Sequence, residues 1–211
     1  MESIDLWVEE HRLWDAGFKT VCGADEAGAG PLAGPVYAAA VILPRDLHIE
    51  GLNDSKKLTE KKRDLIFDEI IEKAEAYSIV SIGVEEIDAI DILNARMKAM
   101  DLAIKQLSIT PDMALIDGNR DHGSCCAIEA PHELLIKGDG RSANIAAASI
   151  LAKVSRDREM IRLAADYPAY HFEKHKGYGT KVHYAALDAC GPCPIHRRTF
   201  LKKWEARRGK Q

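Results

Sequence analysis

The sequence lacks any long apolar stretch, and this absence limits the classes to which the protein can belong. No segment approaches the ~20 uninterrupted apolar residues that span a bilayer. The first ten residues are acidic, whereas a secretory leader is basic and then apolar. We therefore expect a cytosolic protein with no membrane partner. Because 46% of the 211 residues are hydrophobic, the chain is sufficient for a single core.

Cysteine is scarce and its spacing is incomplete for a zinc site. Cys190 and Cys193 have the gap of a half-site and His196 lies nearby, but no second pair completes four ligands. We expect five free thiols. The chain also lacks the Gly-Lys-Ser/Thr ending of a P-loop. Its glycine-rich stretch 28–34 is followed by a β-branched run that predicts a strand, whereas a dinucleotide fingerprint must be followed by a helix. Small residues in such a turn instead let a ligand approach the backbone.

A large net charge is absent as well, but the near-balance hides an uneven distribution. Residues 141–211 carry 15 Lys and Arg against 6 Asp and Glu, whereas residues 1–140 carry 14 against 27. Such asymmetry suits a protein that gathers cations in one place and phosphates in another. A solvated charged surface is the alternative explanation.

Hydropathy patterns predict alternating strands and helices. Helical periodicity follows Thr59, a plausible N-cap, and a second apolar stripe steps from Leu93 to Leu107. Strands are predicted at 20–24, 36–43, 78–84, 113–116 and 134–137, and further helices at 145–167 and 199–208. This order implies an α/β fold with a mixed sheet covered by helices. We expect one domain, 1–211, on which a basic C-terminal extension, 168–211, packs.

Acidic residues follow three of the predicted strands. Asp25 and Glu26 come after the first, Asp117 after the strand 113–116, and Asp139 after the strand 134–137. Strand ends in an open α/β sheet bring distant residues together, so these four carboxylates are expected to converge. Neighbouring carboxylates repel one another, and a hard cation such as Mg²⁺ or Mn²⁺ would offset that cost. Exposed acidic turns, or a helix cap at Asp139, are the alternatives.

Basic and aromatic residues suggest a phosphate-binding surface. Lys56 and Lys57, together with Lys174, Lys176, Lys181, Arg197 and Arg198 in the extension, are candidates for contacts without sequence preference. Tyr178 lies between two glycines in a basic stretch, where an aromatic ring can stack on a sugar or base. Solvated charges and ordinary loop packing remain alternatives.

Seven motifs taken in order resemble bacterial ribonuclease HII, a type 2 ribonuclease H. They are Gly-Ala-Asp-Glu-Ala-Gly at 23–28, Asn-Asp-Ser-Lys-Lys-Leu at 53–58, Leu-Ile-Asp-Gly-Asn at 115–119, Lys-Gly-Asp at 137–139, the Ala-rich run 145–154, His-Lys-Gly-Tyr-Gly-Thr at 175–180 and His-Arg-Arg-Thr-Phe at 196–200. The resemblance covers about residues 21–200. It implies a ribonuclease H-like core with a mixed five-stranded sheet and a C-terminal helical part that helps to hold a duplex.

The resemblance also implies a reaction and roles for residues. Asp25, Glu26, Asp117 and Asp139 would be the catalytic acids that bind Mg²⁺ or Mn²⁺. The implied activity is hydrolysis of the RNA strand of RNA–DNA hybrids and nicking 5′ of ribonucleotides embedded in duplex DNA, which removes such ribonucleotides and primers and leaves 5′-phosphate and 3′-hydroxyl ends. The nucleic acid would be contacted by Gly28, Ala29, Gly30, Ser55, Lys56, Lys57, Asn119, Lys176, Tyr178 and Arg197. Tyr178 would sense the ribonucleotide junction. Asp157 is a tempting fourth acid, but its flanking arginines suit an ion pair better. A monomer is expected.

One position departs from the family pattern, since Ala29 stands where an arginine is usual. A methyl group cannot replace a planar cation that fixes a phosphate or orients Tyr178. We therefore expect weaker substrate binding or junction selectivity. Two alternatives stay open: another ribonuclease H-like nuclease, such as an integrase or resolvase, and a nucleic-acid-binding module that has lost catalysis.

Overall fold

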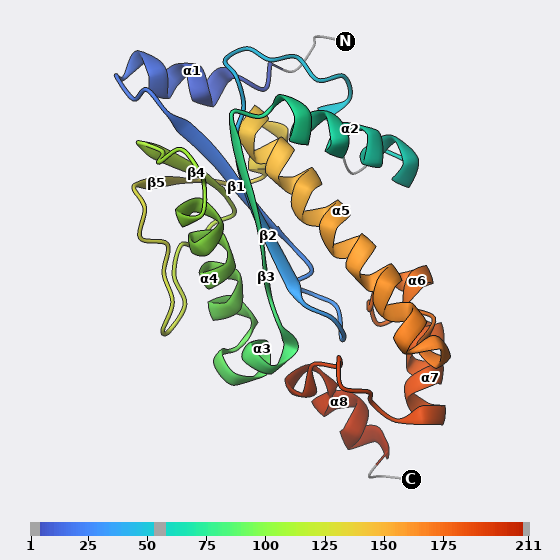
Figure 1. Ribbon diagram of the computed structural model, residues 1–211. Coiled ribbons are helices and arrows are strands. Elements are labelled where there is room, and N and C mark those ends of the chain that lie inside the picture. The colour runs from blue at the N-terminus through green and yellow to red at the C-terminus, as the bar shows by residue number, and fades with distance from the viewer. Residues whose placement is uncertain (1–4, 53–57, 209–211) are drawn as a thin grey trace.

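A five-stranded sheet with helices on both faces forms the centre of the protein (Figure 1). The computed structural model describes residues 5–52 and 58–208. The strands are β1 (Val21–Ala27), β2 (Val36–Ile42), β3 (Ala76–Ile82), β4 (Met113–Asp117) and β5 (His132–Leu135). Their order is β3-β2-β1-β4-β5, in which the first three strands run antiparallel and β4 and β5 add parallel to β1. The predicted mixed five-stranded sheet is confirmed.

Eight α-helices are found in the described residues. They are α1 (Val8–Asp15), α2 (Glu60–Lys73), α3 (Val84–Ile90), α4 (Ile92–Lys105), α5 (Ala143–Asp166), α6 (Phe172–His175), α7 (Lys181–Cys190) and α8 (Arg198–Arg208). Short 3-10 helices occupy Gly138–Gly140 and Pro168–Tyr170. Among these described segments, no helix combines the length and the apolar character that a bilayer crossing needs.

Local sequence signals account for where the main helices begin. The Thr59 hydroxyl accepts a hydrogen bond from the Lys62 N–H, as its predicted N-cap role requires. Ser142 caps α5 in the same way by accepting from the Ile145 N–H. Of the apolar stripe predicted from Leu93 to Leu107, Met97, Met100 and Ile104 are buried in α4 and belong to the core cluster on the sheet. Leu93 is half-buried, and Leu107 lies beyond the end of α4 at Lys105.

The bounds of three predicted strands were wrong. The strand predicted at 134–137 is β5 at His132–Leu135. The strand predicted at 78–84 is β3 at Ala76–Ile82, and Val84 instead starts α3, which the sequence reading missed. The first strand does not stop at residue 24 but continues through Asp25 and Glu26, because both pair with β2 opposite Ala39 and Ala38.

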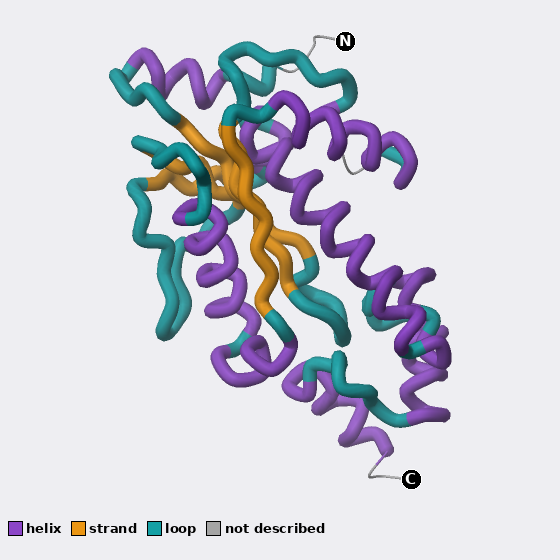
Figure 2. Tube along the Cα trace, viewed as in Figure 1, coloured by secondary structure: helices purple, strands orange, loops and turns teal. Residues whose placement is uncertain are grey.

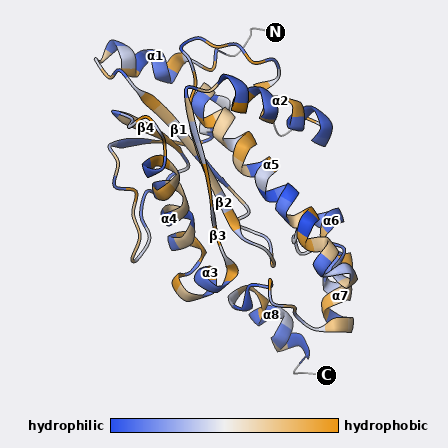
Figure 3. Ribbon diagram, in the orientation of Figure 1, coloured by the Kyte–Doolittle hydropathy of each residue, from blue (hydrophilic) through white to orange (hydrophobic). Residues whose placement is uncertain are grey.

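The two faces of the sheet are covered by different helices (Figure 2). One core cluster packs α4 against alternate residues of the strands, including Cys22 and Ala24 of β1. On the other face, α5 and α2 pack on the opposite set, including Ala39 and Val41 of β2. Figure 3 shows that α5 begins with apolar residues and becomes hydrophilic further along. That change from apolar to polar occurs where α5 borders the cavity described below.

The C-terminal extension packs on the end of α5 and on the loop after β1. Its apolar residues share one buried cluster with Leu32, Ala33 and Met160. The Asp88 carboxylate of α3 accepts hydrogen bonds from the N–H groups of Arg198 and Thr199 and from the Thr199 hydroxyl. These bonds supply the N-terminal cap of α8 and tie it to the sheet side of the molecule.

Candidate active site

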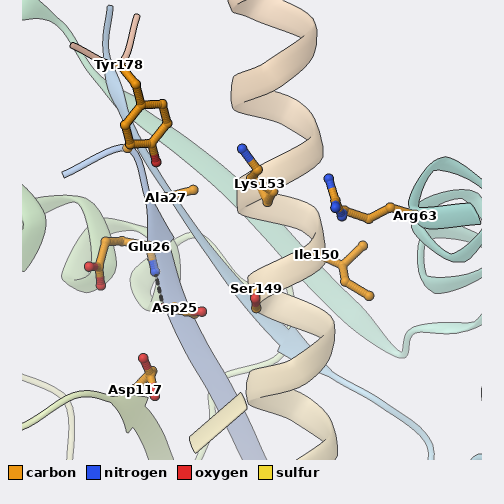
Figure 4. Close-up of a pocket in the computed structure, with 10 residues that line it drawn as sticks. Asp25, Glu26, Ala27, Arg63, Asp117, Ser149, Ile150, Lys153 and Tyr178 are labelled. Atoms are coloured by element: carbon orange, nitrogen blue, oxygen red, sulfur yellow. Dashed lines mark hydrogen bonds between the residues drawn. The ribbon is translucent and has the colours of Figure 1, made fainter. Parts of the chain in front are cut away.

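Three carboxylates line one cavity of about 370 Å³ at the ends of β1 and β4. Asp25 and Glu26 lie near the end of β1, and Asp117 is the last residue of β4. Because β1 and β4 are parallel neighbours with Ala24 paired to Ile116, the next residue of each strand falls at the same edge. Figure 4 shows Asp25 and Asp117 near one another, with Glu26 directed to the other side of β1.

Asp139 lies close to this group without lining the cavity. It falls in the 3-10 helix Gly138–Gly140 that follows β5, the strand next to β4. The Asp117 carboxylate accepts a hydrogen bond of 2.6 Å from the Gly138 N–H, so the two segments are joined directly. The structure therefore gathers all four predicted acids in one region, although Asp25 and Glu26 lie within their strand and Asp139 does not immediately follow one.

Burial and mutual repulsion dominate the electrostatics of the acids. Asp25 is only 8% exposed, and burial followed by the charges of Glu26, Asp117 and Asp139 holds its pKa well above the ordinary range. Burial also raises the pKa of Glu26, although Arg96 of α4 opposes this through an ion pair of 2.5 Å. The second oxygen of Glu26, Oε2, is buried with no hydrogen-bond partner. A bound cation would therefore offset the cost of burying these carboxylates side by side.

The side chains do not stand as a closed metal cage. Within 5–52 and 58–208, no group of three or more His, Cys, Asp or Glu side chains is arranged so that it could hold a metal ion. Glu26 is engaged with Arg96, and the Asp25 carboxylate accepts a hydrogen bond of 2.7 Å from the Glu26 N–H. Binding of an ion would require the carboxylates to draw together.

The opposite wall of the cavity is cationic, and the sequence reading missed it. Ser149 and Lys153 project from α5, and Arg63 projects from α2 (Figure 4). Lys153 also forms an ion pair of 2.8 Å with Asp157, so Asp157 is paired as expected, though with a lysine and not with its flanking arginines. The spacing of Ser149 and Lys153 by four residues places them on one helix face, a signal that was available in the sequence.

Two buried guanidinium groups hold the loop 28–34 that borders the cavity. Arg197 donates to the carbonyls of Gly34, Ala29 and Gly28 at 3.0, 2.9 and 2.7 Å. Arg156 donates to the carbonyls of Pro35 and Ala33 at 3.0 and 3.2 Å. Burial, with the nearby charge of Arg156, lowers the pKa of Arg197 to about 9, which leaves it protonated at neutral pH.

Arg197 therefore does not fit the phosphate contact expected from the sequence. Its side chain is fully buried and all three of its donor nitrogens are used by the loop. The group that approaches the Gly28 backbone closely is a side chain of the protein and not a ligand. The φ of Gly28 is +94°, and an added Cβ would lie 2.0 Å from the Arg156 Nε. The extension, through Arg197, and α5, through Arg156, therefore fix the shape of the loop together.

Tyr178 stands at the mouth of the cavity. The residue is 44% exposed, and the Arg156 guanidinium lies 5.8 Å from the ring centroid. The nearest atom to a Cβ built on Gly30 would be a ring carbon of Tyr178 at 3.9 Å, so loop and ring adjoin. Arg156 thus places a planar cation beside Tyr178, a contact that was not predicted from the sequence.

The remaining predicted contacts are placed as follows. Asn119 is exposed just beyond β4. Lys176 is half-buried and donates to the Glu173 carbonyl at 2.6 Å, which limits its availability to a ligand. Ser55, Lys56 and Lys57 lie outside the described residues. All five cysteines are free thiols, as expected.

Comparisons with known proteins agree with this geometry. The sequence profile of the family described as Ribonuclease HII matches residues 22–203. The ribonuclease HII of Caldicellulosiruptor saccharolyticus is 51% identical over 92% of each chain, and that of Endomicrobium trichonymphae is 54% identical over 90% of each. Among solved structures, ribonuclease H2 from Pyrococcus horikoshii OT3 superposes with a TM-score of 0.75 at 28% identity, covering 92% of this chain and 100% of the other.

A more distant structure adds a likeness of fold. Bst-RNase HIII, solved in complex with Mn²⁺, has a TM-score of 0.62 at 21% identity and covers 91% of this chain and 71% of that one. The match to the ribonuclease HII profile spans most of the sequence, and both curated relatives carry the same name. The chain therefore belongs to the ribonuclease HII family and is a ribonuclease H enzyme.

Proposed function

We propose that Asp25, Glu26, Asp117 and Asp139 are the catalytic acids and that they bind Mg²⁺ or Mn²⁺. The observation that carries the proposal is the burial of Asp25 among three other carboxylates at the edge of a cavity. The fit is supported by an all-oxygen donor set and by the buried, unpartnered Oε2 of Glu26. When bound, a divalent cation supplies a lowered pKa for an attacking water and charge stabilisation at the phosphate.

The residues around the cavity suggest how a nucleic-acid strand is held. Arg63 and Lys153 face the acids and offer charge to a phosphate of the strand. Tyr178 presents an exposed ring that can pack on a sugar. The loop 28–34 presents backbone groups beside that ring, and the 2′-hydroxyl is the group that distinguishes RNA from DNA there.

From membership of the ribonuclease HII family we infer that the enzyme nicks on the 5′ side of ribonucleotides embedded in duplex DNA, in addition to cutting the RNA strand of hybrids, and leaves 5′-phosphate and 3′-hydroxyl ends. The acids would hold the cation that activates the attacking water and positions the phosphate, so no side-chain nucleophile is needed. Residues 168–211 act in the same unit, since they hold the loop and supply Tyr178. A cytosolic monomer is the proposed working form.

A duplex with one internal ribonucleotide, incubated with Mg²⁺ or Mn²⁺, tests the proposal. We expect a single nick at the ribonucleotide and a loss of at least about a thousandfold in rate for Asp117→Asn, because catalytic acids act as a unit. Arg120→Ala, an exposed residue near Asp117 in sequence, is the matched control and should cut normally. Binding without cutting would revive the alternative of a lost activity. The integrase-like alternative has no support from the profile match.

A further inference from the structure

Three buried histidines lie beneath Tyr178, and the proposed reaction does not use them. His183 and His196 are 0% and 1% exposed, and His175 is 9% exposed. The His175 and His183 rings stack with centroids 4.6 Å apart, and His183 and His196 are 5.1 Å apart. Phe172 packs against all three rings. So many polar nitrogens in an apolar setting require hydrogen bonds with defined directions.

The contacts set the direction of a hydrogen-bond chain. The Cys193 N–H donates to His196 Nδ1 at 3.0 Å, which is shorter than the 3.3 Å between that nitrogen and the Cys193 carbonyl. His196 then carries its proton on Nε2 and donates to His183 Nε2 at 2.9 Å. His183 carries its proton on Nδ1 and donates to the Tyr178 carbonyl at 3.0 Å. We call this chain the histidine relay.

The relay is stable only while both rings are neutral. A second proton on His183 would place N–H groups on both facing Nε2 atoms, so the bond of 2.9 Å would become a repulsion. A second proton on His196 would go to Nδ1 and face the Cys193 N–H, which now donates to that nitrogen. Burial, with lesser effects from the surroundings, lowers the pKa of both His183 and His196 to about 4. The charged or titratable groups that face the pair are His175, Arg198, the Cys193 thiol, which lies 3.1 Å from His196 Nδ1, and Tyr170, whose ring packs on His196. Of these, His175 and Arg198 oppose protonation of His196.

The relay ends where the two segments that border the cavity meet. The Gly177 carbonyl accepts from the Leu32 N–H at 2.9 Å, and the Leu32 carbonyl accepts from the Arg197 N–H at the same distance. His196 itself bridges to Ala33. A shift in His196 or His183 would therefore move the Tyr178 backbone relative to the loop 28–34, which Arg197 holds by its side chain.

We propose that His183, oriented by His196, is a positioning residue that fixes Tyr178 against the loop 28–34, and that recognition of a ribonucleotide depends on its hydrogen bond to the Tyr178 carbonyl. The inference rests on the proposed function, in which Tyr178 packs on the sugar. It assigns a role to two side chains that do not line the cavity. They act through the Tyr178 main chain and touch no reacting atom.

Two substitutions at His183 separate positioning from packing. In His183→Asn the amide nitrogen takes the place of Nδ1 and can still donate to the Tyr178 carbonyl. In His183→Gln the amide oxygen takes the place of Nε2, accepts from His196 and leaves that carbonyl without its side-chain donor. Both remove the ring from Phe172, so their melting temperatures should fall alike. We expect kcat/KM on the single-ribonucleotide duplex to fall about tenfold for His183→Gln and to stay within about threefold for His183→Asn, the effect of one hydrogen bond.

A double-mutant cycle with Tyr178→Ala tests whether His183 acts through Tyr178. If it does, adding His183→Gln to Tyr178→Ala should change kcat/KM by less than about twofold. A full tenfold loss in that background would overturn the inference, and so would equal activities of His183→Gln and wild type. A wild-type enzyme that fails to nick the ribonucleotide would instead overturn the proposed function.

Nitrogen NMR of the histidine rings tests the relay in the unmodified protein. We expect His183 protonated at Nδ1, His196 protonated at Nε2, and neither ring titrating between pH 8 and about 5.5. Either ring titrating near the ordinary pKa of 6.5, or the opposite tautomers, would overturn the relay. This measurement does not depend on the folding of any variant.

Discussion

Arg197 joins the C-terminal extension to the loop 28–34, and Arg197→Lys should break that link. The planar guanidinium donates to three carbonyls at once, those of Gly28, Ala29 and Gly34. In lysine the single Nζ falls near the position of the guanidinium carbon, one bond short of both terminal nitrogens. It can therefore satisfy one of these carbonyls without a backbone shift and leaves two.

The cost follows from the number of carbonyls left without a donor. A buried polar group that loses its partner costs about 1–3 kcal/mol, so two such groups give a loss of roughly 2–4 kcal/mol after some relaxation of the loop. That is a large part of the 5–15 kcal/mol by which domains are usually stable. The loop carries the backbone groups that face the substrate, so we also expect kcat/KM to fall by about tenfold or more.

Urea denaturation and steady-state cleavage measure the two effects. Arg198→Lys is the matched control, because that side chain is the next residue and is exposed. It should change stability by less than about 0.5 kcal/mol. If Arg197→Lys were as stable and as active as this control, the three hydrogen bonds would not hold the loop, and the role assigned to the extension would be wrong.

Three further predictions concern the cavity. Ala29→Arg should raise affinity for the single-ribonucleotide duplex several-fold; an unchanged rate and cut position would show that Arg156 already supplies the missing cation. Asp25→Asn should abolish cleavage yet raise the unfolding free energy by roughly 1 kcal/mol at neutral pH without divalent ions, because the raised pKa of Asp25 means that its ionisation above pH 3.8 costs stability. The melting temperature of the variant should vary less than that of the wild type across pH 4–8, and a variant less stable than the wild type would refute the repulsion. Arg63→Ala and Lys153→Ala should each reduce the slope of log affinity against log salt by about 1, and an unchanged slope in a binding titration would remove them from the phosphate-contacting wall.

Local patterns were sufficient to predict the helices with clear periodicity. The stripe that includes Met97 and Met100 and the N-cap at Thr59 depend on residues a few positions apart, and the structure confirms both. The seven-residue helix α3 was missed because its apolar residues are few and its N-cap, Gly83, makes no side-chain hydrogen bond. Short segments of this kind carry little periodic signal.

Long-range contacts explain the other errors. Asp25 and Glu26 fall inside β1 because β2 continues to pair with them, a register that no local pattern reveals. Arg197 was predicted at the surface because a basic run is usually solvated, whereas its three partners lie more than 160 residues earlier in the chain. The convergence of the acids was predictable only because each lies at or near the end of a neighbouring strand.

Anomalous diffraction from crystals soaked in Mn²⁺ tests most directly whether the four acids form the metal site. We predict Mn²⁺ peaks roughly 2 Å from carboxylate oxygens of Asp25, Glu26, Asp117 and Asp139, with Glu26 turned from Arg96 towards the ion. Peaks that lie elsewhere on the protein, or none at saturating Mn²⁺ in an enzyme that is active in the same buffer, would contradict the assignment of these residues.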